Sequence, residues 1–169
     1  KVTDEMLDRI FEVFEMTPHI IKQVLTKRPH RMRAYLAKRW GDKEPPSHVW
    51  LGVSVEAEKE KWRIELLQRT PAAVRFLSVE PLIEDIGEID LVGISQLIVG
   101  GESGVGARPF DLRWAESIKN QCEAAGIPVF IKQLGSNSIP PQPKMKSSKG
   151  GDWTTWPESL RVRQFPVVA

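Results

Sequence analysis

Cysteine is almost absent from this sequence, and its scarcity excludes two kinds of fold. The 169 residues include a single cysteine, Cys122. One thiol cannot build a disulfide framework, and there is no cysteine cluster to hold zinc or an iron–sulfur centre. The three histidines, His19, His30 and His48, lack the spacing typical of metal ligands. We therefore predict no metal site in this chain.

Long apolar runs are also missing. No stretch approaches the roughly 20 apolar residues that a membrane helix needs, and no signal peptide is recognisable. We therefore expect no membrane partner and a cytoplasmic location. The composition, 41% hydrophobic and 27% charged, is that of a globular protein with one real core. The sequence opens on Lys1 inside a helical pattern, and we expect it to be a fragment.

Strand and helix patterns alternate along the chain. Apolar runs typical of buried strands lie at 20–26, 49–56, 74–80, 97–99 and 128–133. Helical patterns begin at Thr3, Pro29 and Asp111, and a further one has Trp62, Leu66 and Leu67 as its apolar residues. The strands are spaced at roughly 22 to 30 residues, which favours parallel strands joined by right-handed crossovers.

Polar residues follow every predicted strand, and they decide the fold class that we predict. In an open doubly wound sheet, the alternative, only strands beside the switch point need such endings, whereas in a barrel all of them surround one mouth. We therefore predict an α/β fold, a partial (β/α) barrel of about five parallel strands with flanking helices over residues 1–135. Residues 136–169 would form a loop and a tail that packs on the barrel. The strand-end residues are Thr26, Lys27, Ser54, Glu56, Ser78, Glu80, Glu102, Ser103, Lys132 and Gln133.

Five strands cannot close a barrel, so the predicted fold leaves strand edges open. One or more strands would be missing on the N-terminal side, or another segment would cover the opening. Unpaired strand edges readily pair with other chains. We therefore expect self-association or a missing N-terminal segment that covers the edges.

Three glutamates aimed into one mouth would form the centre of a site. Glu56, Glu80 and Glu102 would repel one another and raise each other's pKa unless a cation compensates. Such a group suits a cationic or hydroxyl-rich ligand, or general acid–base chemistry. The alternative is a structural network in which the glutamates pair with Lys27, Lys132 and Arg108.

Two further features suggest contact with anions. Arg108 precedes a helix predicted to start at Asp111, so a guanidinium would lie beside free backbone N–H groups. The segment 22–39 holds seven lysines and arginines and no acid, and Arg28, Arg31 and Arg33 could bind nucleic-acid phosphates. The alternatives are a tight turn around Arg108 and a solvated basic helix face.

Several long blocks resemble one known family. The segments QVLTKRPHRM, VWLGVSVE, VRFLSVEPL, LIVGGESGVGARP, QCEAAGIPVFIKQLG and GGDWTTWPESLRVRQFP occur in this order over nearly the whole chain. Together they are similar to the phage gene-product thirty-seven/sixty-eight family. That family of bacterial and phage proteins is related to radical-SAM barrels, near spore photoproduct lyase.

This resemblance implies a function for the full-length protein. Complete members begin with a segment resembling CxxxCxxC, which would hold a [4Fe–4S] cluster that binds S-adenosylmethionine. This sequence has no such segment, and Cys122 lies elsewhere. The resemblance implies the C-terminal part of a radical-SAM-like enzyme of unknown substrate, inactive in radical chemistry without the missing segment. Glu56, Ser78, Glu80, Glu102, Arg108 and Lys132 would then hold cofactor and substrate.

Two other functions stay open. One is a nucleic-acid-binding barrel module of phage or prophage origin, which kinship to a DNA-repair lyase favours. The other is a metal-dependent hydrolase built on the three glutamates. The absence of a nearby histidine or aspartate makes the hydrolase the weakest of the hypotheses.

Overall fold

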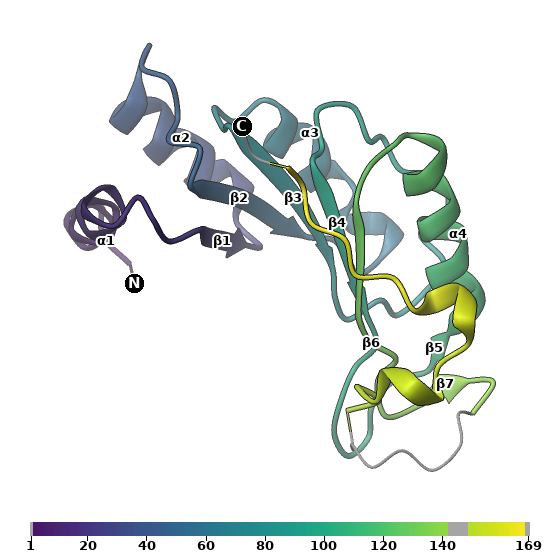
Figure 1. The fold of residues 1–169 in the computed structure, drawn as a ribbon. Helices are drawn as coiled ribbons and strands as arrows, with labels where there is room; N and C mark the ends of the chain where they lie inside the picture. Colours follow the sequence, from purple (N-terminus) through teal and green to yellow (C-terminus); the bar gives the residue numbers. More distant parts are fainter. Residues whose placement is uncertain (1, 142–148, 168–169) are drawn as a thin grey trace.

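A five-stranded parallel sheet forms the centre of the fold (Figure 1). The computed structural model describes residues 2–141 and 149–167, so residues 142–148 and 168–169 of the predicted loop and tail lie outside the described residues. The sheet has the order β1-β2-β3-β4-β6, and every neighbouring pair is parallel. Its strands are β1 (Lys22–Thr26), β2 (Val49–Ser54), β3 (Val74–Val79), β4 (Gln96–Gly100) and β6 (Val129–Gln133).

The strand order follows the chain order, which confirms the predicted fold class. A doubly wound sheet would reverse its order at a switch point, and this sheet does not. The fold is a partial (β/α) barrel with five parallel strands and flanking helices. A separate short pair, β5 (Phe110–Asp111) with β7 (Ser138–Ile139), lies near the carboxyl end of β6.

Four α-helices accompany the strands, and their predicted starts are close to the observed ones. The Thr3 hydroxyl accepts a hydrogen bond from the Met6 N–H, and the Asp111 carboxylate accepts one from the Arg113 N–H, as N-caps do. The helices are α1 (Asp4–Met16), α2 (Pro29–Trp40), α3 (Trp62–Gln68) and α4 (Leu112–Ala124). The described residues also form three single 3-10 turns, η1 (Glu58–Glu60), η2 (Trp153–Thr155) and η3 (Glu158–Leu160).

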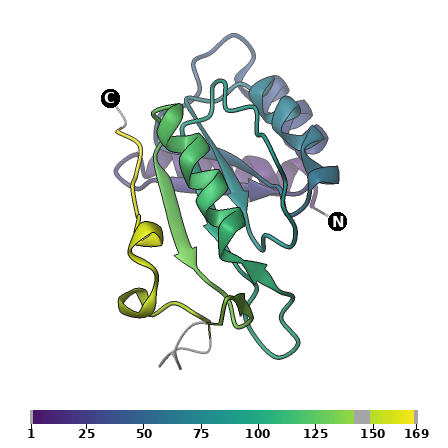
Figure 2. The same cartoon turned by 90° about the vertical axis from the view of Figure 1, so that its right-hand side faces the viewer.

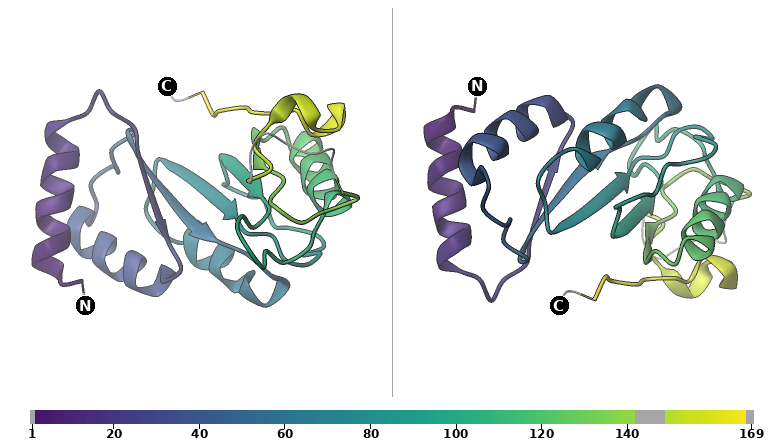
Figure 3. Two further views of the ribbon diagram at one scale, coloured as in Figure 1. Left: turned by 90° about the horizontal axis from the view of Figure 1, so that it is seen from below. Right: turned by 90° about the horizontal axis from the view of Figure 1, so that it is seen from above.

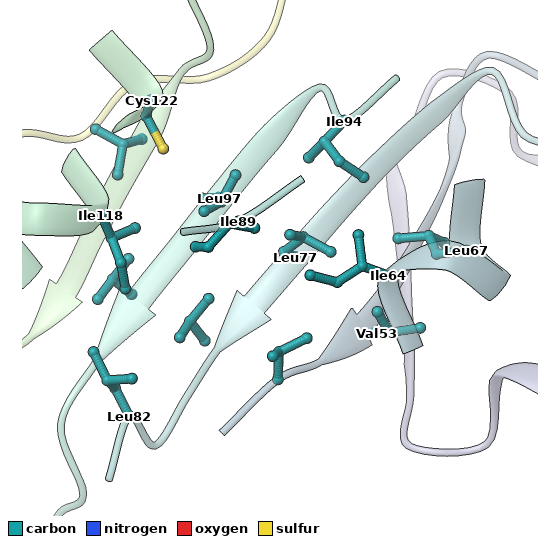
Figure 4. Packing of buried hydrophobic residues seen from close by; sticks show 14 of the residues in the cluster. Val53, Ile64, Leu67, Leu77, Leu82, Ile89, Ile94, Leu97, Ile118 and Cys122 are labelled. Atoms are coloured by element: carbon teal, nitrogen blue, oxygen red, sulfur yellow. The ribbon is translucent and has the colours of Figure 1, made fainter. Parts of the chain in front are cut away.

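The main core lies between the sheet and the helices α2, α3 and α4, which follow its outer face (Figure 3). Strand residues at alternating positions, such as Val53, Leu77 and Leu97, are fully buried there. Figure 4 shows them facing Ile64 of α3 and Ile118 of α4. The inner face has a smaller cluster formed by Trp50, Val74 and Phe76 with Ile98 packed against it.

The two edges of the sheet differ. At the β6 edge the C-terminal tail runs alongside the strand (Figure 2), where the Ile131 N–H donates to the Val162 carbonyl and the Gln164 N–H to the Val129 carbonyl. At the other edge, the prediction of a buried strand at 20–26 is wrong. Leu25 is 48% exposed, because β1 pairs only with β2 within the described residues.

None of the helices within residues 2–141 and 149–167 combines the length and apolar character that crossing a bilayer requires.

One glycine makes room for the inner-face cluster, and this gives a first prediction. Gly52 lies directly opposite Phe76, and a Cβ at residue 52 would lie within 2.6 Å of the Phe76 ring. Gly52→Ala should therefore lower the free energy of unfolding by about 1–3 kcal/mol, as overpacked cores do. Urea denaturation measures this. In a Phe76→Leu background the same change should cost less; an equal cost in both backgrounds would contradict the contact.

Candidate functional site

The inner face of the sheet is hollowed into a bowl, a cavity of about 470 Å³. Phe76 and Ser78 of β3 point into it, and the register places them beside Gln96 and Ile98 of β4. Glu80 and Lys132 line it at the carboxyl ends of β3 and β6, the side of the sheet on which barrels of this kind bind ligands. Its lining residues come from four strands, the end of β3 and the tail: Gln23, Leu25, Phe76, Ser78, Glu80, Gln96, Ile98, Phe130, Lys132 and Phe165.

Glu80 is the carboxylate of the bowl. Its side chain is 17% exposed, and its oxygens lie 3.5 Å from the Lys132 Nζ, while the Ser78 hydroxyl donates to Oε2 across 3.3 Å. Gly100 leaves space for it, since a Cβ there would lie 2.6 Å from Oε1. Burial raises the pKa of Glu80, and the charge of Lys132 and the two hydrogen bonds only partly oppose this. Glu80 therefore binds a proton more readily than an ordinary glutamate.

The remaining wall of the bowl is mostly apolar. The Phe130 and Phe165 rings meet edge to face with centroids 5.3 Å apart. Gln96 is completely buried; its side-chain N–H donates to the Gln164 carbonyl, whereas its Oε1 accepts no hydrogen bond from the described residues. The bowl thus combines aromatic surface with one carboxylate and one ammonium, a mixture typical of small-molecule sites.

Glu56 belongs to a separate groove outside the bowl. Its carboxylate pairs with Lys27 and, across 2.9 Å, with Arg63, which also binds Glu60. Burial raises the pKa of Glu56, but the hydrogen bond and charge of Lys27, together with Arg63, outweigh it and hold that pKa below its usual value. The groove has a volume of about 220 Å³, and Arg108 also lines it.

Glu102 lies on the loop after β4 and binds Arg108 through both carboxylate oxygens. The Arg108 Nε lies 2.8 Å from Oε2 and its Nη2 2.9 Å from Oε1, and the Arg108 backbone N–H also donates to Oε2. These hydrogen bonds lower the pKa of Glu102 to about 2. This carboxylate is ionised at all ordinary pH values.

The structure does not bring the three glutamates into one mouth as predicted. Only Glu80 lines the bowl, and each glutamate has its own cation: Lys27 for Glu56, Lys132 for Glu80 and Arg108 for Glu102. These are the three pairs of the alternative network. The mutual rise in pKa does not occur, because the pKa of Glu56 and of Glu102 is lowered and burial alone raises that of Glu80.

Comparison with known proteins assigns the chain to a family. A family model described as "Protein of unknown function (DUF5131)" matches residues 1–157, from the start of the sequence to the residue after Trp156. The chain belongs to this family. Searches of curated proteins and of solved structures found no match. The description of this family names no activity. The phage and radical-SAM parts of the resemblance therefore stay predictions.

The other predicted strand-end residues support loops and turns. The Thr26 hydroxyl accepts from the Arg28 N–H, and the Gln133 side chain donates to the Gly101 carbonyl across 2.9 Å. Ser54 is buried, and its carbonyl accepts from Arg63. Ser103 lies exposed on the loop after β4. None of these four side chains lines the bowl.

Several basic residues of the segment 22–39 form ion pairs with acidic residues of α1. Arg31 pairs with Asp4, while Arg39 binds Asp8 and Glu15. Arg28 and Arg33 are exposed and form no ion pair with the described residues. Of the three arginines predicted to contact nucleic acid, Arg31 is therefore engaged within the fold.

Sequence reasoning missed most of the wall of the bowl. Gln96 and Phe130 lie within or beside predicted strands, and their inward orientation depends on which residues they pair with across the sheet. A signal was present for Gln96, since a polar residue begins an otherwise apolar strand. Arg63 was also missed, because it lies on a helix whose distance from Glu56 is set only by folding.

The raised pKa of Glu80 predicts how stability depends on pH. Since the folded-state pKa of Glu80 lies above the usual glutamate value of 4.5, the native state holds this proton more tightly than the unfolded chain. The stability that this bound proton contributes is fully present below the pKa that Glu80 has in the unfolded chain. It is lost as the pH rises through the pKa that Glu80 has in the folded state. Wild type should therefore lose stability relative to Glu80→Gln across that interval, measured by urea denaturation at a series of pH values.

Glu102→Gln is the matched control for this measurement. The lowered pKa of Glu102 gives a contribution of opposite sign, present above the unfolded pKa and lost as pH falls toward about 2. If both variants changed the pH profile in the same direction, the assignment of a raised pKa to Glu80 would be wrong.

Proposed function

We propose that this chain is the ligand-binding, C-terminal part of a radical-SAM-like barrel enzyme of the phage gene-product thirty-seven/sixty-eight type. The bowl would hold a small ligand that carries a positive charge. The observation that carries this proposal is the mostly buried Glu80 at the carboxyl end of β3, beside Lys132 and an aromatic wall. A carboxylate that is shielded from water attracts a ligand cation more strongly than an exposed one does.

S-adenosylmethionine has the groups that this bowl would recognise. Its ammonium and sulfonium are cations suited to Glu80, and its carboxylate suits the Lys132 ammonium. Its adenine is a flat ring suited to the wall that Phe130 and Phe165 form. This ligand is also the one that the family resemblance implies.

The residues of this chain do not fit an iron–sulfur cluster. A [4Fe–4S] cluster needs several converging thiolates, whereas the sequence has only Cys122. That thiol is fully buried in α4, and burial raises its pKa to about 12. No group of three or more metal-ligating side chains occurs in residues 2–141 and 149–167. The proposal therefore assigns ligand binding, and no radical step, to these residues.

Titration calorimetry with S-adenosylmethionine tests the proposal. We expect binding, and we expect S-adenosylhomocysteine, which lacks the sulfonium charge, to bind about fivefold more weakly, as losing an interaction of ~1 kcal/mol implies. Glu80→Gln should remove this preference, whereas Glu102→Gln, outside the bowl, should leave it unchanged. Affinity for the cation should also increase as pH rises through the pKa of Glu80. Equal affinity of wild type for both ligands, or no binding, would contradict the proposal.

The second candidate, a nucleic-acid-binding module, is favoured by Arg28 and Arg33. Both are exposed on or beside α2 without a carboxylate partner in the described residues. Fluorescence anisotropy with a labelled single-stranded oligonucleotide distinguishes the two functions. Affinity that falls with salt and is reduced in the Arg28→Ala, Arg33→Ala double variant, without binding of S-adenosylmethionine, would favour this module.

A further inference from the structure

The groove around Glu56 is a second recess at the carboxyl ends of the strands, and it shares no lining residue with the bowl. Its walls come from segments that follow four neighbouring parallel strands: Lys27 follows β1, residues 56–63 follow β2, Pro81 follows β3 and Arg108 follows β4. A strand paired with the open edge of β1 would lie on the far side of Lys27, away from the other three walls, and would leave the groove unfilled.

Positive charge is in excess in this groove. Its two carboxylates are those of Glu56 and Glu60, and Glu102 compensates Arg108 from outside the lining. Four cationic side chains line it: Lys27, Lys59, Arg63 and Arg108. One positive charge is therefore left without a carboxylate. A recess with an excess of one sign of charge concentrates ligands of the opposite sign, so this groove favours an anion.

Three of the cations keep N–H donors for a ligand. Lys59 is exposed, and its ammonium forms no ion pair or hydrogen bond with the described residues. The Lys27 ammonium binds Glu56 alone among these residues, and an ammonium has three donors. Arg108 uses its Nε and Nη2 to bind Glu102, which leaves its Nη1 without a partner in the described part of the chain.

Arg63 forms a buried part of the wall and fixes both carboxylates. Its Nη1 donates to the Ser54 carbonyl and to Glu56, and its Nη2 pairs with Glu60. Its Nε is buried and has no acceptor within the described residues. A buried donor without an acceptor is costly, and buried polar groups are normally paired. The acceptors of residues 2–141 and 149–167 therefore do not satisfy all the donors of this groove.

We propose that the groove binds the phosphate monoester group of a small molecule. A monoester has three terminal oxygens and nearly two negative charges at neutral pH. Lys27, Lys59 and Arg108 approach it from three different segments, so each cation can bind one oxygen. A phosphodiester offers two such oxygens and one charge, and is a poorer match. Pro81 and Ile83 provide apolar surface for the carbon part of the ligand.

Nuclear magnetic resonance titration of the full chain with two simple esters tests this proposal. Methyl phosphate is a monoester, and dimethyl phosphate is a diester with the charge of a nucleic-acid backbone unit. Above pH 7 we expect methyl phosphate to bind about fivefold more tightly, the size typical of one ion pair. It should shift the amide resonances of Lys27, Lys59 and Arg108. Because the bowl has none of these residues, this result does not depend on whether S-adenosylmethionine binds there.

Two variants with the same loss of charge locate the contact. Lys59→Ala should weaken the binding of methyl phosphate about fivefold, and Lys59→Arg should retain it. Lys43→Ala should leave it unchanged, because Lys43 is exposed on the segment before β2, at the opposite end of that strand. Absence of binding, or an equal effect of Lys59→Ala and Lys43→Ala, would overturn the proposal. Equal affinity for the two esters would also overturn it, because the groove would then recognise a phosphodiester or charge alone.

Discussion

The handedness of the crossovers between parallel strands is the constraint on which the rest of this fold depends. Since consecutive strands are neighbours, right-handed connections place α2, α3 and α4 on the same face of the sheet. That face receives the large apolar core. No helix of residues 2–141 and 149–167 packs on the inner face, which side chains of the strands and of the tail fill instead. Trp50, Val74 and Phe76 fill part of it, and the space beside them is the bowl.

The number and distance of the cations at each carboxylate distinguish the three glutamates that follow neighbouring strands. Glu102 forms a bidentate pair with Arg108 on an exposed loop. Glu56 binds two cations, Lys27 and Arg63. Both carboxylates are therefore stable as anions. Glu80 has only one ammonium, at 3.5 Å, so the cost of removing its charge from water dominates. The same residue type at equivalent strand ends thus acquires different proton affinities.

Local signals in the sequence were enough for the fold, but not for the site. The repeated Ser-Val-Glu ending at 54–56 and 78–80, Thr3 as an N-cap and Pro29 at a helix start all act over a few residues, and each element formed near its predicted place. The prediction could not choose between a shared carboxylate site and separate ion pairs, because that choice depends on where Lys27, Lys132 and Arg108 lie after folding. The partner of Arg31 is 27 residues away, and no local pattern indicates it.

The same limit explains the error at β1. An apolar run predicts burial, but whether a strand lies inside a sheet or at its edge depends on what pairs with its far side. Ile20, Ile21 and Leu25 are each about half exposed for that reason.

The buried thiol of Cys122 can serve as a chemical probe for the separation of α4 from the sheet. Alkylating reagents attack the thiolate, and a side chain with no exposed surface and a pKa of about 12 offers almost none while α4 stays docked. Its modification would therefore proceed only through states in which that helix has separated from the sheet. Because the sequence has no second cysteine, the rate of modification would count those openings without any engineered label.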